Sequence, residues 1–130
     1  MSVAARDRRA VLPVAARLSA MGYDLMSTSG TASALEGEGI AVSRVRKIHE
    51  GRPNVLDHLA NGSIALIVNT PSGKGARTDE GRIRSVAVSH GVPCITTIAG
   101  ARAAVHAIAD AQGDLTVSLQ EQISAQKRSA

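Results

Sequence analysis

The chain has 130 residues, 44% of them hydrophobic, and Tyr23 is its single residue of the Phe, Tyr and Trp group. Such a chain can form one domain with an aliphatic core, and the shortage of aromatic side chains excludes binding of single-stranded nucleic acid by base stacking. The net charge of +4 comes from scattered basic residues, which suits a small anionic ligand or a solvated basic surface better than a nucleic-acid groove.

The first part of the chain predicts two strand–helix units. Residues 2–4 look like the end of a first strand, which suggests a chain cut from something longer. A helix follows, which Asp7 can cap and Gly22 can end. Apolar residues recur in this helix at helical spacing: Val11, Ala15, Leu18 and Met21. A second strand over residues 23–27 leads through a polar loop into a short helix that ends near Glu36.

The middle of the chain contains the strand around which we expect the fold to be organised. A third extended segment over residues 41–45 precedes a polar loop and a helix over residues 54–61. The next run, residues 64–68, is apolar and rich in β-branched side chains, which is typical of a strand buried on both faces of a parallel sheet. This run stops abruptly at a polar loop, residues 69–74.

The remaining sequence continues the alternation of helices and strands. We expect a helix from Thr78 or Asp79 to Gly91, a strand over residues 93–96, a loop over residues 97–100, a helix over residues 101–109, an extended segment at Val117 and a last helix over residues 119–126. Because strand and helix alternate about five times, the sequence predicts an α/β fold: a doubly wound, mostly parallel five-stranded sheet flanked by helices, in one domain over residues 1–130.

Polar residues follow each predicted strand. The carboxyl ends of parallel strands meet at one edge of a sheet, so these residues should converge there. In chain order they are Arg6-Asp7-Arg8, Thr28-Ser29-Gly30-Thr31, Lys47, the loop from Asn69 to Lys74, and Thr96-Thr97. Hydroxyls, cations and backbone N–H groups near glycine hold a phosphate, and the central loop has no carboxylate to move a proton. The sequence therefore predicts a phosphate site without catalytic residues.

Each of these residues also has a structural alternative. Thr28 and Thr31 can be turn or cap residues, and Lys47 can be a solvated loop lysine. Arg8 can be an ordinary first-turn residue, although a cation at a helix N-terminus opposes the helix dipole, which favours a functional reason for it.

Acid–base and metal chemistry have less support. We expect Asp7 to act as a helix cap and His49-Glu50 to be structural, because no second carboxylate lies nearby. Cys94 is a lone cysteine in an apolar run, so we expect a small buried residue in a reducing compartment. The histidines are far apart in sequence, which predicts no metal site. With no signal peptide and no apolar run of membrane-spanning length, we expect a cytoplasmic chain without contact to a membrane.

Five segments closely resemble, in order and spacing, the C-terminal regulatory domain of the carbamoyl-phosphate synthase large subunit. They are SVAARDR, STSGTAS, KIHEGRPN, LIVNTPSGKG and VPCITTIAGARA, and the resemblance covers residues 2–125. It implies the Rossmann-like, methylglyoxal-synthase-like fold and a domain that binds allosteric effectors and does no chemistry. It also implies a C-terminal fragment of a much longer subunit, because the ATP-grasp and glutaminase parts do not fit in 130 residues.

The resemblance also implies the residues of the effector site. Carried over by position, the residues that hold the phosphate and run along the nucleotide are Arg8, Thr28, Thr31, Lys47, Asn69, Thr70, Ser72, Gly73 and Lys74. Arg8 stands where the family usually has a lysine, and Lys74 replaces an arginine. Near the family's ornithine site, Cys94 and Ile95 replace a tyrosine and an aspartate, while Thr96 keeps the site's threonine.

The implied effectors are UMP, IMP and, in many members, ornithine. The implied protein partners are the rest of the large subunit and the glutaminase small subunit, in pyrimidine and arginine biosynthesis. No cofactor is implied for this domain, whereas the parent enzyme uses ATP, Mg²⁺ or Mn²⁺, and K⁺.

Two enzymatic alternatives remain. One is a free-standing methylglyoxal synthase acting on dihydroxyacetone phosphate. That reaction needs a carboxylate base beside the phosphate, and only Asp7 is expected near the pocket. The other, the cyclohydrolase half of the bifunctional purine enzyme, shares only the early SxGT-like loop.

Overall fold

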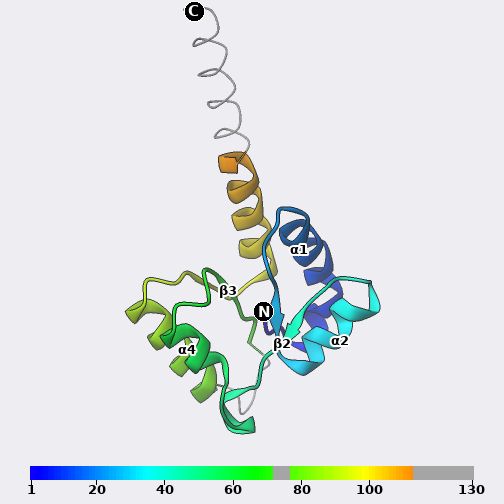
Figure 1. The fold of residues 1–130 in the computed structure, drawn as a ribbon. Helices are drawn as coiled ribbons and strands as arrows, with labels where there is room; N and C mark the ends of the chain where they lie inside the picture. Colours follow the sequence, from blue (N-terminus) through cyan, green and yellow to red (C-terminus); the bar gives the residue numbers. More distant parts are fainter. Residues whose placement is uncertain (72–76, 113–130) are drawn as a thin grey trace, which may run out of the picture.

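The computed structural model of the chain describes residues 1–71 and 77–112 (Figure 1). The predicted site residues Ser72, Gly73 and Lys74, the extended segment at Val117 and the helix over residues 119–126 lie outside the described residues. The elements in chain order are η1 (Ala5–Asp7), α1 (Arg8–Ala20), β1 (Met26–Ser27), α2 (Ser29–Gly37), β2 (Ser43–Arg44), η2 (Ile48–Glu50), α3 (Val55–Ala60), β3 (Ile67–Val68), α4 (Arg77–Ser89) and β4 (Cys94–Ile95), followed by helical residues 98–112.

The extended segments run parallel, in the order β2, β1, N-terminal segment, β3, β4. β1 pairs with β2 and β3 with β4, both in parallel register. The N-terminal segment joins the two pairs, because Ser2 forms a parallel bridge with Asn69 and the N–H of Thr28 donates to the carbonyl of Met1 at 3.3 Å. The parallel five-segment α/β arrangement is thus confirmed, although each regular strand is only two residues long, shorter than predicted.

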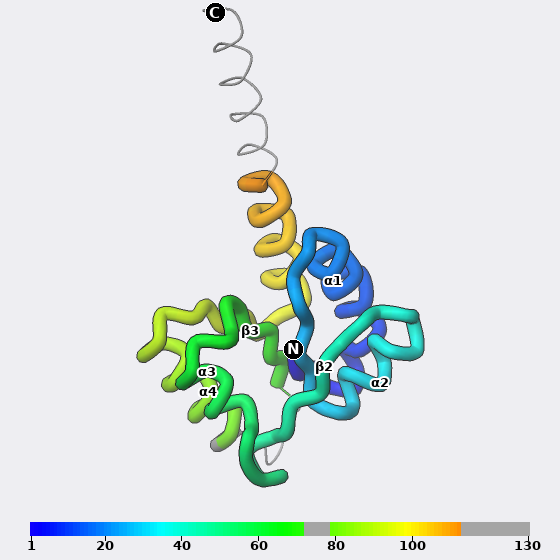
Figure 2. The backbone as a smooth tube through the Cα atoms, in the orientation of Figure 1, coloured from blue at the N-terminus to red at the C-terminus, as the bar shows by residue number. Residues whose placement is uncertain are grey.

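Two apolar clusters form the core. The larger one contains four residues of the first helix, Val11, Val14, Ala15 and Leu18, which confirms the helical spacing of apolar residues there. The smaller one centres on Leu59, Ile67 and Ala87, where α3 and α4 pack together beside β3. In Figure 2 the N-terminus lies at the centre, with α1 and α2 on one side and α4 on the other.

Several boundaries differ from the prediction for local reasons. The last described helix begins at residue 98, inside the predicted loop, because the Thr97 hydroxyl accepts a hydrogen bond from the N–H of Gly100 at 3.0 Å and caps it. Asp7 occupies the N-cap position of α1, as predicted, but its side chain makes no capping hydrogen bond. Among the described residues, no helix combines the length and apolar character that crossing a bilayer requires.

Candidate functional site

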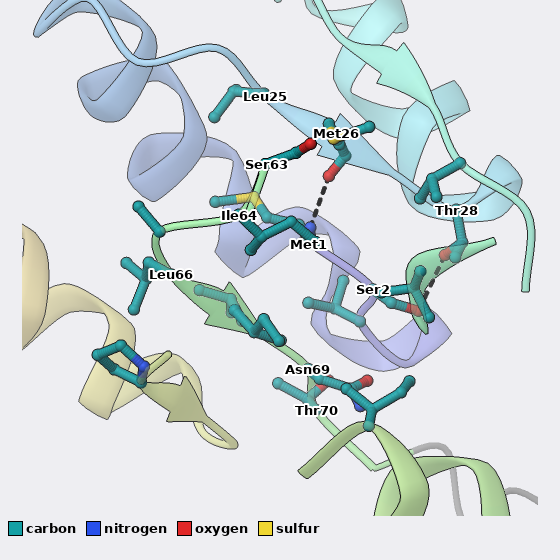
Figure 3. A pocket seen from close by; sticks show the side chains of 18 of the residues that line it. Met1, Ser2, Leu25, Met26, Thr28, Ser63, Ile64, Leu66, Asn69 and Thr70 are labelled. Atoms are coloured by element: carbon teal, nitrogen blue, oxygen red, sulfur yellow. Dashed lines mark hydrogen bonds between the residues drawn. The ribbon is translucent and has the colours of Figure 1, made fainter. Parts of the chain in front are cut away.

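The N-terminus of α2 directly follows β1 at the edge of the sheet. Thr28 precedes the helix in an extended conformation, with φ −68° and ψ 158°, and its side chain makes no capping hydrogen bond. Instead its hydroxyl donates to the hydroxyl oxygen of Ser2 at 2.9 Å (Figure 3). The side chain at the cap position therefore leaves the first-turn N–H groups of α2 available to an anion, which the helix dipole also favours.

Arg8 brings a cation to this helix N-terminus. Its guanidinium lies against Gly30, in the first turn of α2, so closely that a Cβ atom on Gly30 would overlap with Nη2 and Cζ of Arg8. Nε of Arg8 is buried and has no hydrogen-bond partner in the described part of the chain, and no described carboxylate pairs with this side chain. A cation and a helix N-terminus repel each other unless an anion lies between them, so this arrangement is suited to an anionic group.

The threonine hydroxyls have a structural task. The hydroxyl of Thr31, a residue that is 1% exposed, accepts a hydrogen bond from the N–H of Val3 at 3.0 Å. The Thr70 hydroxyl accepts one from the N–H of Ala4 at 2.9 Å. Both threonines thereby fix the N-terminal segment where it leaves the sheet. The backbone N–H groups of the α2 first turn are better placed to serve a ligand than the buried Thr31 hydroxyl.

The KIHEGRPN segment forms a turn that carries Lys47. The N–H of Lys47 donates to Oε1 of Glu50 at 2.7 Å, and Nη1 of Arg46 donates to the carbonyl of Arg52 at 2.7 Å. Asn54 then caps α3 by accepting a hydrogen bond from the N–H of Leu56 at 2.9 Å. These bonds occupy polar groups of the turn locally, and the exposed Lys47 side chain has no ion pair among the described residues. The Lys47 cation is therefore available to an anionic ligand.

A cavity of about 870 Å³ lies between the β1 side and the β3 side of the molecule. Four of the predicted site residues line it: Thr28, Lys47, Asn69 and Thr70. Arg8 and Thr31 are not among its lining residues, and they lie beside it at the start of α1 and in the first turn of α2. Thr96, the predicted ornithine-side residue, follows β4 and is also absent from the lining.

Three carboxylates correct the expectation that only Asp7 lies near the pocket. Asp79 and Glu80, in the first turn of α4, and Asp24, just before β1, line the cavity. Nδ1 of His49 lies 3.7 Å from Oδ2 of Asp79, so the His49-Glu50 turn is linked to α4 across the cavity. Sequence reasoning missed this pair because the two residues are far apart in the chain. The sequence feature that could have indicated a carboxylate at the cavity is the acidic first turn of the helix after the central loop.

Two further reactive groups, the thiol of Cys94 and the amino group of Met1, have shifted pKa values. Cys94 lies half-buried in β4, and burial raises the pKa of its thiol, which disfavours the nucleophilic thiolate. Burial also lowers the pKa of the Met1 amino group from 8.0 to about 6. Within residues 1–71 and 77–112, no group of three or more His, Cys, Asp or Glu side chains is placed to hold a metal ion.

Comparison with known proteins places this geometry in a family. A family model described as an MGS-like domain matches residues 10–96. The chain is 54% identical over 108 residues to a carbamoyl phosphate synthase large chain of Rhodopirellula baltica, covering 83% of this chain and 10% of that one. It is 51% identical over 109 residues to the C-terminal section of a carbamoyl phosphate synthase large chain of Methanopyrus kandleri, covering 83% and 20%. The chain thus spans about a tenth to a fifth of the length of these relatives.

A solved structure supports the same assignment at the level of the fold. The methylglyoxal synthase of Elizabethkingia anophelis superimposes with a TM-score of 0.64 over 80% of this chain and 74% of that one, at 14% sequence identity. The α/β fold with parallel strands is therefore shared, whereas the low identity says nothing of activity. The family model, which matches more than half of the residues, decides the relationship: this chain belongs to the MGS-like domain family and is homologous to part of the carbamoyl phosphate synthase large chain.

Proposed function

We propose that this domain binds a nucleoside monophosphate, UMP or IMP, as the regulatory ligand of a carbamoyl phosphate synthase large chain. The observation that carries the proposal is the Arg8 guanidinium held against Gly30 at the α2 N-terminus, with its buried Nε unpaired among the described residues. A phosphate dianion would accept hydrogen bonds from this guanidinium and from the first-turn N–H groups, and it would neutralise the repulsion between them.

The cavity next to this anion site suits the rest of a nucleotide. Its volume of about 870 Å³ lies in the range of small-molecule sites, and its lining combines apolar side chains with the amide of Asn69 and the cation of Lys47. Ser72, Gly73 and Lys74, which complete the predicted site, follow Pro71 in the sequence. Ornithine is a weaker candidate, since Thr96 alone matches the residues that the resemblance implies for it.

The rest of the proposal concerns the whole enzyme. In a synthase, occupancy of this site would alter reactions in other parts of the large chain, which would use ATP with Mg²⁺ or Mn²⁺ and K⁺ to make carbamoyl phosphate for pyrimidine and arginine biosynthesis. The glutaminase small subunit would supply ammonia. The domain itself would need no cofactor. Coupling of this kind requires a difference in affinity for UMP or IMP between two states of the synthase.

Calorimetric titration of the chain with UMP, IMP and ornithine tests the proposal. We expect UMP or IMP to bind and Arg8→Met to weaken binding by about 10- to 100-fold, because charge-assisted hydrogen bonds are worth about 1.5–3 kcal/mol. Arg17→Met is the matched control, since Arg17 is an exposed arginine in the last turn of the same helix. Equal loss of affinity in the two variants, or no binding of either nucleotide, would contradict the proposal.

A methylglyoxal synthase activity is the second candidate, and the carboxylates at the cavity favour it. Asp79 lines the cavity and lies beside His49, so the cavity contains a carboxylate that could act as the base. This activity predicts release of phosphate and methylglyoxal from dihydroxyacetone phosphate, with loss on Asp79→Asn. We expect no such turnover if the domain is a regulatory module.

A further inference from the structure

Two buried side-chain atoms in the described part of the chain have no hydrogen-bond partner: Nε of Arg8 and the hydroxyl oxygen of Ser27. Ser27 is 0% exposed, and neither residue lines the cavity. Buried polar groups are almost always hydrogen-bonded, so two unpaired atoms need a physical reason. The two atoms are chemically complementary, because the Nε–H group can only donate and a hydroxyl oxygen can accept.

Ser27 lies on the face of the sheet that α1 covers. It is the last residue of β1 and therefore lies at the carboxyl edge of the sheet. Alternate residues of a strand share a face, and Leu25, two residues earlier, belongs to the apolar cluster that contains Val11 and Val14 of α1. The Ser27 side chain therefore points toward α1, away from the side of Met26, which lines the cavity.

Arg8 approaches the same place from α1. It is the first residue of this helix and lies three residues before the fully buried Val11, so it continues the buried stripe of the helix. Its guanidinium lies against Gly30, and a Cβ atom on Gly30 would be 3.5 Å from Nε. Because Gly30 follows Ser27 by three residues, Arg8 and Ser27 meet at the turn between β1 and α2.

The nitrogen atoms of the Arg8 guanidinium differ in their surroundings. Nε alone among them is buried without a partner, whereas the residue as a whole is only half-buried. An anion can therefore reach the Nη groups, and Nε can gain a partner only from inside the protein. A guanidinium fixed at Nε would lose less side-chain freedom when it binds an anion.

We propose that Ser27 is a positioning residue for the anion site: its hydroxyl accepts a hydrogen bond from Nε–H of Arg8 when an anion binds to the Nη groups. This bond holds the guanidinium over the first turn of α2. Ser27 acts only through Arg8, because its own oxygen is buried and cannot touch the ligand. The inference rests on the proposed binding of a phosphate at this helix N-terminus.

Titration calorimetry of the full chain with UMP tests this role. We expect Ser27→Ala to weaken UMP binding about three- to tenfold, because a hydrogen bond to a charged group is lost. The melting temperature of the ligand-free variant should not fall, since the variant removes an unpaired buried hydroxyl. Equal affinity of the wild type and Ser27→Ala would overturn the proposal.

Ser33→Ala is the matched control for the loss of a serine hydroxyl beside an arginine. The Ser33 hydroxyl, in α2, accepts a hydrogen bond from Nη2 of Arg44 at 3.1 Å, so it serves a different cation. We expect this variant to bind UMP as the wild type does. A loss equal to that of Ser27→Ala would overturn the proposal.

A double-mutant cycle shows whether Ser27 acts through Arg8. In the Arg8→Met background, Ser27→Ala should change UMP affinity by less than about twofold, because the group that it positions is gone. The full three- to tenfold loss in that background would overturn the proposal, since it would mean that Ser27 affects the site by another route.

The Nε–H signal of Arg8 in the ¹⁵N-labelled chain gives a second readout, assigned by its loss in Arg8→Met. On addition of UMP or inorganic phosphate, we expect exchange of this proton with water to slow about tenfold or more in the wild type and to stay fast in Ser27→Ala. Equal slowing in both chains would overturn the role of Ser27 and leave the anion site standing. No binding and no slowing in the wild type would overturn both proposals.

Discussion

The two ends of the cavity differ in how their polar groups are used. At the α2 end, the hydroxyls of Thr28, Thr31 and Thr70 bind other parts of the protein, while the cations Arg8 and Lys47 have no described carboxylate partner. At the end around Met1, the lining side chains are mainly apolar and the Met1 amine is buried. The first end is suited to an anion, and the second to an apolar group.

The largest expected effect concerns the buried amine of Met1. Its pKa is 8.0 when unfolded and about 6 when folded, so the unfolded state binds the proton more tightly. Burial of the charged amine therefore destabilises the folded state most below pH 6, less as the pH rises, and not at all above pH 8. The free energy of unfolding should rise by about 3 kcal/mol between pH 6 and pH 8. Urea denaturation at pH 6, 7 and 8 measures it.

Acetylation of the Met1 nitrogen is the control for this pH effect. The titratable side chains that line the same cavity are Tyr23, Asp24, Lys47, His49, Asp79 and Glu80. The acetylated chain should lose most of the pH dependence, and an undiminished slope would contradict burial of a charged amine.

Thr70→Val tests whether the hydroxyls at the α2 end are structural. The variant leaves the buried N–H of Ala4 without its acceptor, so we expect the free energy of unfolding to fall by about 1–3 kcal/mol. Ser89→Ala is a comparison in which an exposed hydroxyl bond to Ser85 is lost, with an expected change below about 1 kcal/mol. Equal changes in the free energy of unfolding would show that the buried Thr70 bond contributes no more to stability than an exposed one.

Gly30→Ala tests the contact between Arg8 and a bound anion without removing a charge. The new methyl group must displace the end of the Arg8 side chain, so we expect about tenfold weaker UMP binding with no loss of stability, since alanine is the better helix former. Gly37→Ala, in the same helix with no atom within 4 Å of the new Cβ, is the matched control. Unchanged affinity in Gly30→Ala would argue against phosphate contact by Arg8.

The smallest effect is expected for Lys47→Met. The side chain is exposed, so its attraction for a phosphate is screened by solvent, and we expect UMP affinity to fall about two- to fivefold. The loss should be greater in 20 mM than in 200 mM salt. A salt-independent loss would indicate that Lys47 acts through the fold of its turn.

The sequence was sufficient to predict those features that depend on residues close together in the chain. The apolar spacing of α1 and the apolar run before Asn69 predicted a helix and a buried strand, and both are present. It was insufficient where distant segments meet. The bond between Thr70 and Ala4 joins residues 66 apart, and the contact between His49 and Asp79 depends on how α4 packs. The early start of the last described helix was missed because the sequence around Thr97 fits a loop residue and a cap residue equally well.

The most direct test is a titration of the ¹⁵N-labelled chain with UMP, with uridine as the ligand that lacks the phosphate. If the phosphate lies at the α2 N-terminus, the amide signals of Ser29, Gly30 and Thr31 will shift most with UMP and will not shift with uridine. Binding of UMP that leaves these three amides unchanged, or equal binding of uridine, would contradict the account.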